Sequence, residues 1–222
     1  MSGSHQIILG GKTRGYPNVD SYVTGTDTDL GLTITVSKPS GVVSGDRLLV
    51  VIVGNSGTND IAAATGFTER FDTGFTSNLR MHIADRTADG TEGSTFSFTG
   101  TEILNSFAYW CGRIGRVASG STLVIDGVAA TTANPDPPSI SPSWGTTKGS
   151  LVFTFLAHRS SVTLNSWPTG GWNDHHSSQQ TASTIAGAFG AKQAIGSSFN
   201  PGTFSMSGSD VTISVTAAYE GV

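Results

Sequence analysis

The sequence predicts an all-β fold, a jelly-roll-like antiparallel β-sandwich with an extended N-terminal arm. Composition is the first reason. Only 13% of the 222 residues are charged whereas 29 are glycine, a balance typical of many short strands joined by tight turns. The second reason is that the apolar residues, 36% of the chain, fall in short runs that alternate with polar residues or are β-branched. No stretch keeps the helical period, so helices are not expected.

The N-terminal segment, residues 1–28, differs from the rest because it is rich in Gly, Thr, Asn and Asp and alternates little. We interpret it as an extended arm, either a loose terminus or a segment that adds a strand or a clamp to a neighbour. The apolar stretch 7–9 is too short for a secretory signal. The residues expected to contact a neighbour are the apolar and aromatic ones of the arm, namely Ile7, Ile8, Leu9, Tyr16 and Tyr22.

Residues 29–222 are expected to form one β-sandwich domain. In chain order, strands are predicted at 32–36, 48–53, 67–71, 79–85, 95–99, 103–114, 122–125 and 151–155. The run 48–53 is continuously apolar and bounded by turn residues, which predicts a central strand. Residues 127–147 contain four prolines, and because proline cannot donate a ladder hydrogen bond, we expect a loop that crosses between sheets.

The two halves of the domain, about 29–126 and 148–222, resemble each other. The similar pairs are 45–51 with 149–153 (149 − 45 = 104), 65–67 with 170–172 (171 − 66 = 105), 93–100 with 201–208 (203 − 95 = 108) and 108–109 with 218–219 (218 − 108 = 110). Either the halves are structural repeats or they share only the general pattern of short strands and turns. Repeats are favoured, and they predict one interleaved jelly roll of roughly eight to ten strands rather than two tandem sandwiches.

Composition also argues against several classes of function. A net charge of −4 without a basic stretch argues against nucleic-acid binding, and no apolar run is long enough to span a membrane. The single cysteine, Cys111, excludes an internal disulfide and a cysteine-based zinc site. Because it lies within the aromatic run 103–114, we expect it to be a small buried apolar residue.

Three groups of ionisable residues are candidates for a chemical site. Neighbouring strand residues point to opposite faces, so the run 174–176 (Asp-His-His) fits a polar loop or strand better than a metal site. The acids of 85–92 fit a turn better than a calcium loop. Glu69 and Asp72 form a possible glycosidase pair, which only their separation would decide. We therefore predict no catalytic residue, no metal ligand and no cofactor.

Three tryptophans could bind a sugar or another protein through their rings. Trp172 matches Phe67 across the repeat and is expected in the core. Trp144 and Trp167 lie in Gly- and Pro-containing loops and are expected to be exposed, either at a protein interface or stacked on a glycan.

One ordered set of motifs resembles a known family. It consists of G-D-x-L-L-V-V-x-V at 45–53, G-F-T at 66–68 and A-D-R-T-A-D-G-T-E-G-S-T-F-S-F-T-G at 84–100, followed by an aromatic strand. This order is similar to a β-sandwich domain of bacteriophage minor tail and other virion proteins, and the resemblance covers about residues 30–222. It implies a non-enzymatic virion component, a capsid decoration (cement) or minor tail protein made in the host cytoplasm.

The expected partners are capsid or tail proteins of the same virion and further copies of the chain. A homotrimer is one arrangement that jelly rolls adopt at capsid three-fold positions. The alternative is a glycan- or receptor-binding module at a tail tip, with Trp144 or Trp167 as the stacking residue.

Overall fold

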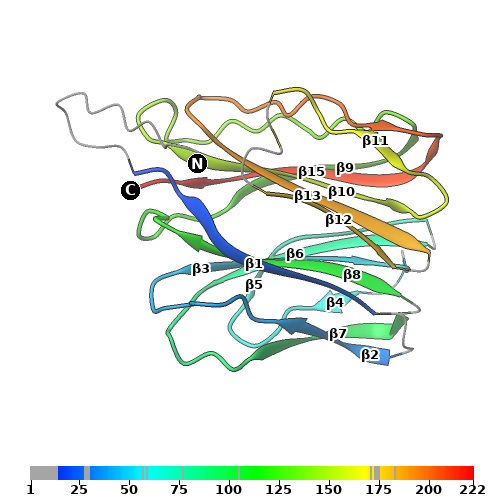
Figure 1. The fold of residues 1–222 in the computed structure, drawn as a ribbon, viewed down its shortest axis with the longest axis horizontal. Helices are drawn as coiled ribbons and strands as arrows, with labels where there is room; N and C mark the ends of the chain where they lie inside the picture. Colours follow the sequence, from blue (N-terminus) through cyan, green and yellow to red (C-terminus); the bar gives the residue numbers. More distant parts are fainter. Residues whose placement is uncertain are drawn as a thin grey trace, which may run out of the picture.

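The computed structural model in Figure 1 describes residues 15–27, 31–56, 58, 60–76, 78–104, 106–170, 172, 176–182 and 184–222. Every regular element within these ranges is a β-strand, and all strand pairs are antiparallel. The predicted all-β sandwich is therefore confirmed. The described residues contain no helix that could cross a membrane.

The N-terminal half forms a five-stranded sheet and a smaller sheet that covers its outer face. The large sheet has the order β1-β8-β3-β6-β5, with β1 (Asn18–Asp27), β3 (Arg47–Gly54), β5 (Thr68–Phe75), β6 (Leu79–Thr87) and β8 (Phe107–Gly115). The small sheet has the order β2-β7-β4, with β2 (Gly31–Ser37), β4 (Ile61–Ala62) and β7 (Thr95–Leu104).

The C-terminal half is built in the same way. Its five-stranded sheet has the order β9-β15-β10-β13-β12, with β9 (Val124–Thr132), β10 (Ser150–Arg159), β12 (His176–Ala182), β13 (Ile185–Ala194) and β15 (Asp210–Glu220). The two strands β11 (Leu164–Ser166) and β14 (Ser205–Met206) pair over its outer face. Figure 1 shows the resulting stack, in which the two large sheets lie between the two small ones.

Alternate residues of each central strand pack into different apolar layers. In β3, Leu49 and Val51 belong to the core between the large sheets, whereas Leu48, Val50 and Ile52 pack under the small sheet of the same half. Successive side chains of a strand point to opposite faces, so a strand with apolar layers on both sides has a continuously apolar sequence. This explains why the run 48–53 was correctly predicted to be a central strand.

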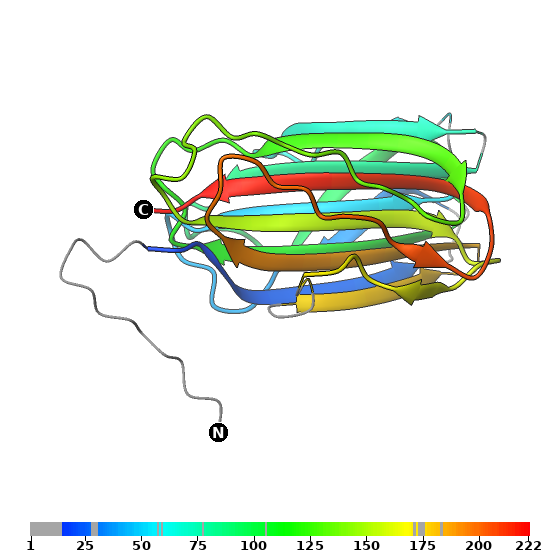
Figure 2. The same cartoon turned by 90° about the horizontal axis from the view of Figure 1, so that it is seen from above.

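The two large sheets pack face to face in a way that repeats when the halves are exchanged. By their positions in the two sheets, β1, β8, β6 and β5 correspond to β9, β15, β13 and β12. The contact of β1 with β12 is matched by that of β9 with β5, and the contact of β8 with β13 is matched by that of β15 with β6. Seen from above, the strands of both large sheets run in similar directions (Figure 2), as in aligned sandwiches. Such paired contacts are those of an isologous dimer, here formed by two halves of one chain. The two large sheets therefore contribute equivalent strands to the contact between them.

The halves do not interleave as a jelly roll would require. Each large sheet takes all five of its strands from one half of the chain. The apolar faces of β3 and its equivalent β10 explain the difference, because each must be covered on both sides. A single two-sheet sandwich would leave one of those faces in water, whereas two sandwiches packed together bury both.

The boundaries of the predicted segments also change. Residues 18–27, expected in the arm, instead form β1, which pairs with β8 at the edge of the first large sheet. Residues 124–132 form the edge strand β9, so the C-terminal half starts there and the expected loop over 127–147 starts only after Thr132. The contact residues Ile7, Ile8 and Leu9 lie outside the described residues.

The last predicted repeat match is out of register. Arg47 is opposite Ile114, and in the other half Leu151 is opposite Tyr219, so Ile114 rather than Tyr109 corresponds to Tyr219 (219 − 114 = 105). The two tyrosines in fact lie in different layers. Tyr109 packs in the outer core of its own half, whereas Tyr219 lies in the core between the large sheets.

Candidate functional site

One side of the N-terminal half ends in two strand edges, those of β1 and β2. Within the described part of the chain, strand β1 pairs with β8 alone and β2 pairs with β7 alone. Tyr22 of β1 is 37% exposed and Leu32 of β2 is 46% exposed. The described part of β1 includes Asp20, but β2 contains neither a charged residue nor a proline. We call this pair of edges, β1 and β2, the open side.

The predicted contact residues Tyr16 and Tyr22 are held by different neighbours. The ring of Tyr22 stacks on Trp110, with 6.2 Å between the ring centroids. Tyr16 is half-buried and covers Gly149, where an added Cβ would lie 2.6 Å from the tyrosine ring. Tyr22 therefore offers part of its surface to solvent on the open side, whereas Tyr16 closes the N-terminal end of β10.

The tryptophans predicted to be exposed are half-buried. The indole nitrogen of Trp144 donates a hydrogen bond of 2.8 Å to Ser150 Oγ. Trp167 packs against Phe204, with 5.7 Å between the ring centroids. Trp172 is fully buried, as the repeat predicted, and its indole nitrogen donates to the Pro201 carbonyl.

A buried polar network joins the two halves between the large sheets. The carboxylate of Asp85 is fully buried and accepts hydrogen bonds from Arg70 Nε at 2.7 Å and from Tyr219 Oη at 2.6 Å. Arg47 Nη1 lies 3.8 Å from the same carboxylate. Burial raises the pKa of Tyr219 well above its usual value, and the neighbouring charge of Asp85 raises it further. The hydrogen bond from Tyr219 is thus a link from β15 of one half to β6 of the other.

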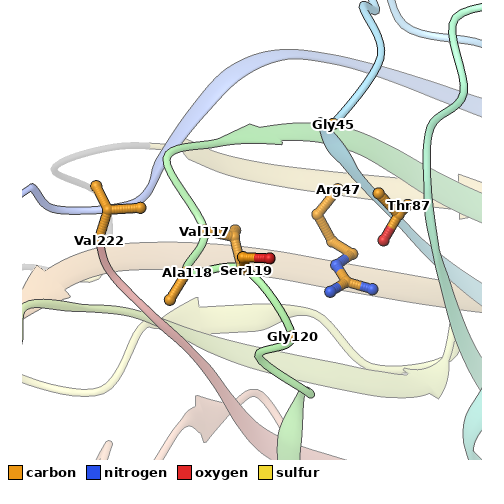
Figure 3. A pocket seen from close by; sticks show the side chains of 8 residues that line it. All are labelled: Gly45, Arg47, Thr87, Val117, Ala118, Ser119, Gly120 and Val222. Carbon is orange, nitrogen blue, oxygen red and sulfur yellow. The ribbon is translucent and has the colours of Figure 1, made fainter.

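A cavity of about 350 Å³ opens beside this network (Figure 3). Its lining consists of Gly45, Arg47, Thr87, Val117, Ala118, Ser119, Gly120 and Val222. Arg47 is the only ionisable side chain of that lining, and its guanidinium also donates to the Ser121 carbonyl at 2.7 Å. The cavity therefore offers a positive charge that is already engaged by protein groups.

A second polar cluster lies on the β5–β6 hairpin and includes both acids of the possible glycosidase pair. Oxygen atoms of Glu69 and Asp72 and a ring nitrogen of His82 all lie within 4.8 Å of one another. Asp72 also accepts a hydrogen bond of 2.5 Å from Arg80 Nε. Burial raises the pKa of Asp72, but its contacts with His82 and Arg80 outweigh burial, so the pKa is below its usual value. This carboxylate is thus ionised at neutral pH.

The three acids of the segment 85–92 do not converge on one point. Asp89 and Glu92 accept hydrogen bonds from backbone amides of the β6–β7 turn, whereas Asp85 points between the large sheets. Asp174 and His175 lie outside the described residues, as does the side chain of His176 in β12.

Sequence reasoning singled out Glu69 and Asp72 but missed His82. The residue lies in a strand that was predicted, but on the face opposite to its apolar residues Met81 and Ile83. A short hairpin loop joins β5 to β6 and places Asp72 opposite His82. The sequence could have revealed His82 only through its position opposite Asp72. That position follows from the register in which β5 and β6 pair.

Comparison with known proteins gives no relative, since no family model, curated protein or solved structure matches the chain.

Proposed function

We propose that the chain is a structural component of a bacteriophage-type virion, a capsid decoration or minor tail protein that acts through protein–protein contacts. The observation that carries this proposal is the open side of the N-terminal half. Strand edges present unpaired backbone donors and acceptors, and proteins that remain monomeric protect them with charged residues, prolines or a covering segment. Strand β2 has none of these sequence devices and exposes Leu32.

The stacked architecture also supports a role in assembly. Four layers of antiparallel strands form a stiff body, and few charges mean that contacts across its surface depend little on salt. An edge strand binds a partner through main-chain hydrogen bonds, with side-chain pockets adding specificity. Another copy of the chain or a neighbouring virion protein can use the open side in this way.

Sedimentation velocity over a range of protein concentrations tests the self-association that this predicts. The variant Leu32→Lys places a charge on the open side and is expected to reduce association strongly. Val128→Lys is the matched control because Val128 is 40% exposed and lies on β9, which contacts β5 at the edge of the large sheets opposite β1. Equal effects of the two substitutions would place the contact elsewhere. A wild-type chain that stays monomeric and does not bind virion proteins would contradict the proposal.

A further inference from the structure

The β5–β6 hairpin contains an irregularity that brings two acids to one face. In a regular strand, residues three apart point to opposite faces. The pairing of β5 with β6 shifts between Glu69 and Phe71, so that Glu69 lies opposite Ala84 and Asp72 lies opposite His82. Ala84 and His82 are alternate residues of β6 and share a face. The bulge therefore directs both carboxylates towards the imidazole, and bulges that redirect side chains are frequent at functional sites.

His82 is the second and independent observation. Its side chain is fully buried, and neither ring nitrogen has a hydrogen-bond partner among the residues that the structure describes. The edge of the ring packs against Phe98, with 5.7 Å between the ring centroids. A buried imidazole whose ring nitrogens make no hydrogen bond is costly, because both nitrogens have lost their water. Nδ1 points into the acidic cluster, 3.5 Å from Asp72 Oδ2 and 3.8 Å from Glu69 Oε2.

These separations suit atoms that share one metal ion. Zinc binds imidazole nitrogen and carboxylate oxygen at about 2.0–2.2 Å, which places tetrahedral ligands roughly 3.3–3.6 Å apart. The distances from Nδ1 to the two oxygens, 3.5 and 3.8 Å, are close to that spacing. A small movement of the exposed Glu69 side chain towards His82 would bring the longer distance to that spacing.

The charge of the cluster also matches a divalent cation. Three carboxylates are present, because Asp60 accepts a hydrogen bond of 2.6 Å from Arg80 Nη2 beside Asp72. Counting these three carboxylates and the Arg80 guanidinium, the formal charge is −3 + 1 = −2. Arg80 binds Oδ1 of Asp72, and Oδ2 faces His82, with the Ile61 amide 3.5 Å from that oxygen.

An ion could reach the cluster only from the side of Glu69. The side chains of His82 and Asp72 are 0% and 5% exposed, whereas that of Glu69 is 52% exposed. An ion would enter past Glu69 and would keep water in its remaining position, as in zinc sites with three protein ligands.

We propose that His82 Nδ1, Asp72 Oδ2 and Glu69 Oε2 form a binding site for one divalent transition-metal ion, with zinc as the best match. One imidazole and two carboxylates also suit Mn²⁺ and Ni²⁺, whereas Ca²⁺ and Mg²⁺ prefer oxygen ligands alone. The ion would fasten the edge strand β5 to β6.

The repeat predicts that there is one such site per chain. Val51 is opposite Ile83 and the equivalent Phe155 is opposite Phe189, so Ala188 takes the place of His82 in the second half. An alanine cannot ligate a metal.

Isothermal titration calorimetry of the full, tag-free chain with ZnCl2 tests the proposal. We expect one equivalent to bind, and the affinity to fall at least tenfold, about 1.4 kcal/mol, in Glu69→Gln. This substitution at an exposed position keeps the shape of the side chain, so the variant should fold. His82→Gln is expected to abolish binding. The matched controls are Asp89→Asn, which removes an exposed acid outside the cluster, and the double variant His175→Ala, His176→Ala; both should bind as the wild type does.

Titration with Co²⁺ gives a second readout, because ligation by nitrogen and oxygen produces visible absorption bands that the His82→Gln variant should lack. Absence of binding at millimolar zinc would overturn the proposal. Binding retained in Glu69→Gln and His82→Gln, or lost in the double histidine variant, would place the ion elsewhere and would also overturn it. None of these results depends on whether the chain self-associates.

Discussion

Removal of the Tyr219 hydroxyl tests whether the two halves are linked through their buried polar network. In Tyr219→Phe, the Asp85 carboxylate loses the 2.6 Å hydrogen bond from the other half but keeps Arg70 at 2.7 Å. A hydrogen bond to a charged group contributes about 1.5–3 kcal/mol. For a chain of this size, that loss corresponds to a decrease in Tm of roughly 3–12 °C.

The stability that Tyr219 contributes should also depend on pH, which gives a second test of the same hydrogen bond. The pKa of Tyr219 is raised in the folded state, whereas an unfolded tyrosine loses its proton near pH 10 (about its reference value). Above that pH the unfolded state releases a proton that the folded state keeps, so the stability contributed by Tyr219 decreases as pH rises. The difference in unfolding free energy between wild type and Tyr219→Phe should therefore be constant at neutral pH and shrink above about pH 10.

Urea unfolding at several pH values measures this difference, with Tyr109→Phe as the control. The Tyr109 hydroxyl accepts a 3.3 Å hydrogen bond from the Ser37 amide within one half, so its loss should cost only about 0.5–1 kcal/mol. Equal destabilisation by the two substitutions, or a Tyr219 effect that does not change with pH, would refute the reasoning.

Two further predictions concern buried titratable groups. Burial raises the pKa of the Cys111 thiol, so a thiol reagent should not modify the native protein and should react fully in urea; rapid native reaction would show that β8 opens. Burial lowers the pKa of His158, so below about pH 6.5 the unfolded state binds a proton that the folded state does not. Relative to His158→Gln, the wild type should lose up to about 1.4 kcal/mol of stability per pH unit there, as measured by urea unfolding, and parallel pH profiles would contradict this.

The sequence predicted the central strands well because each of them corresponds to one short apolar segment. Residues 48–53 are apolar without interruption and residues 151–155 are apolar except for Thr154, and both segments became central strands. The same runs also indicated that both faces are covered, since a half-exposed antiparallel strand would alternate. The same holds for β10, in which Thr154 and Leu156 are also buried. Two central strands that are covered on both faces favour four layers over the single sandwich that we expected.

Strand β1 was missed because its residues are dictated by neighbours far along the chain. An added Cβ at Gly25 would lie 2.5 Å from the ring of Tyr109, so glycine is required there by tertiary contact. Tyr22 is likewise placed by Trp110 of β8. Neither contact leaves an alternating pattern, and the segment therefore looked like an arm.

The cluster of Glu69, Asp72 and His82 could be predicted only in part, for a related reason. Glu69 and Asp72 are close in sequence, but an ordinary strand would put them on opposite faces. The bulge at Arg70, whose side chain turns to Asp85 on the other face, is a feature of the hairpin pairing and not of composition. Without that register, His82 could not be assigned to the same face as the two acids.

Mass spectrometry of purified particles tests the proposed virion role most directly. Particles from the source culture are washed in high salt, and the amount of this chain is measured against the major capsid protein. The proposal predicts that the chain stays on the particles in a fixed ratio, because uncharged contacts resist salt. A chain found only in the soluble fraction would contradict the virion role.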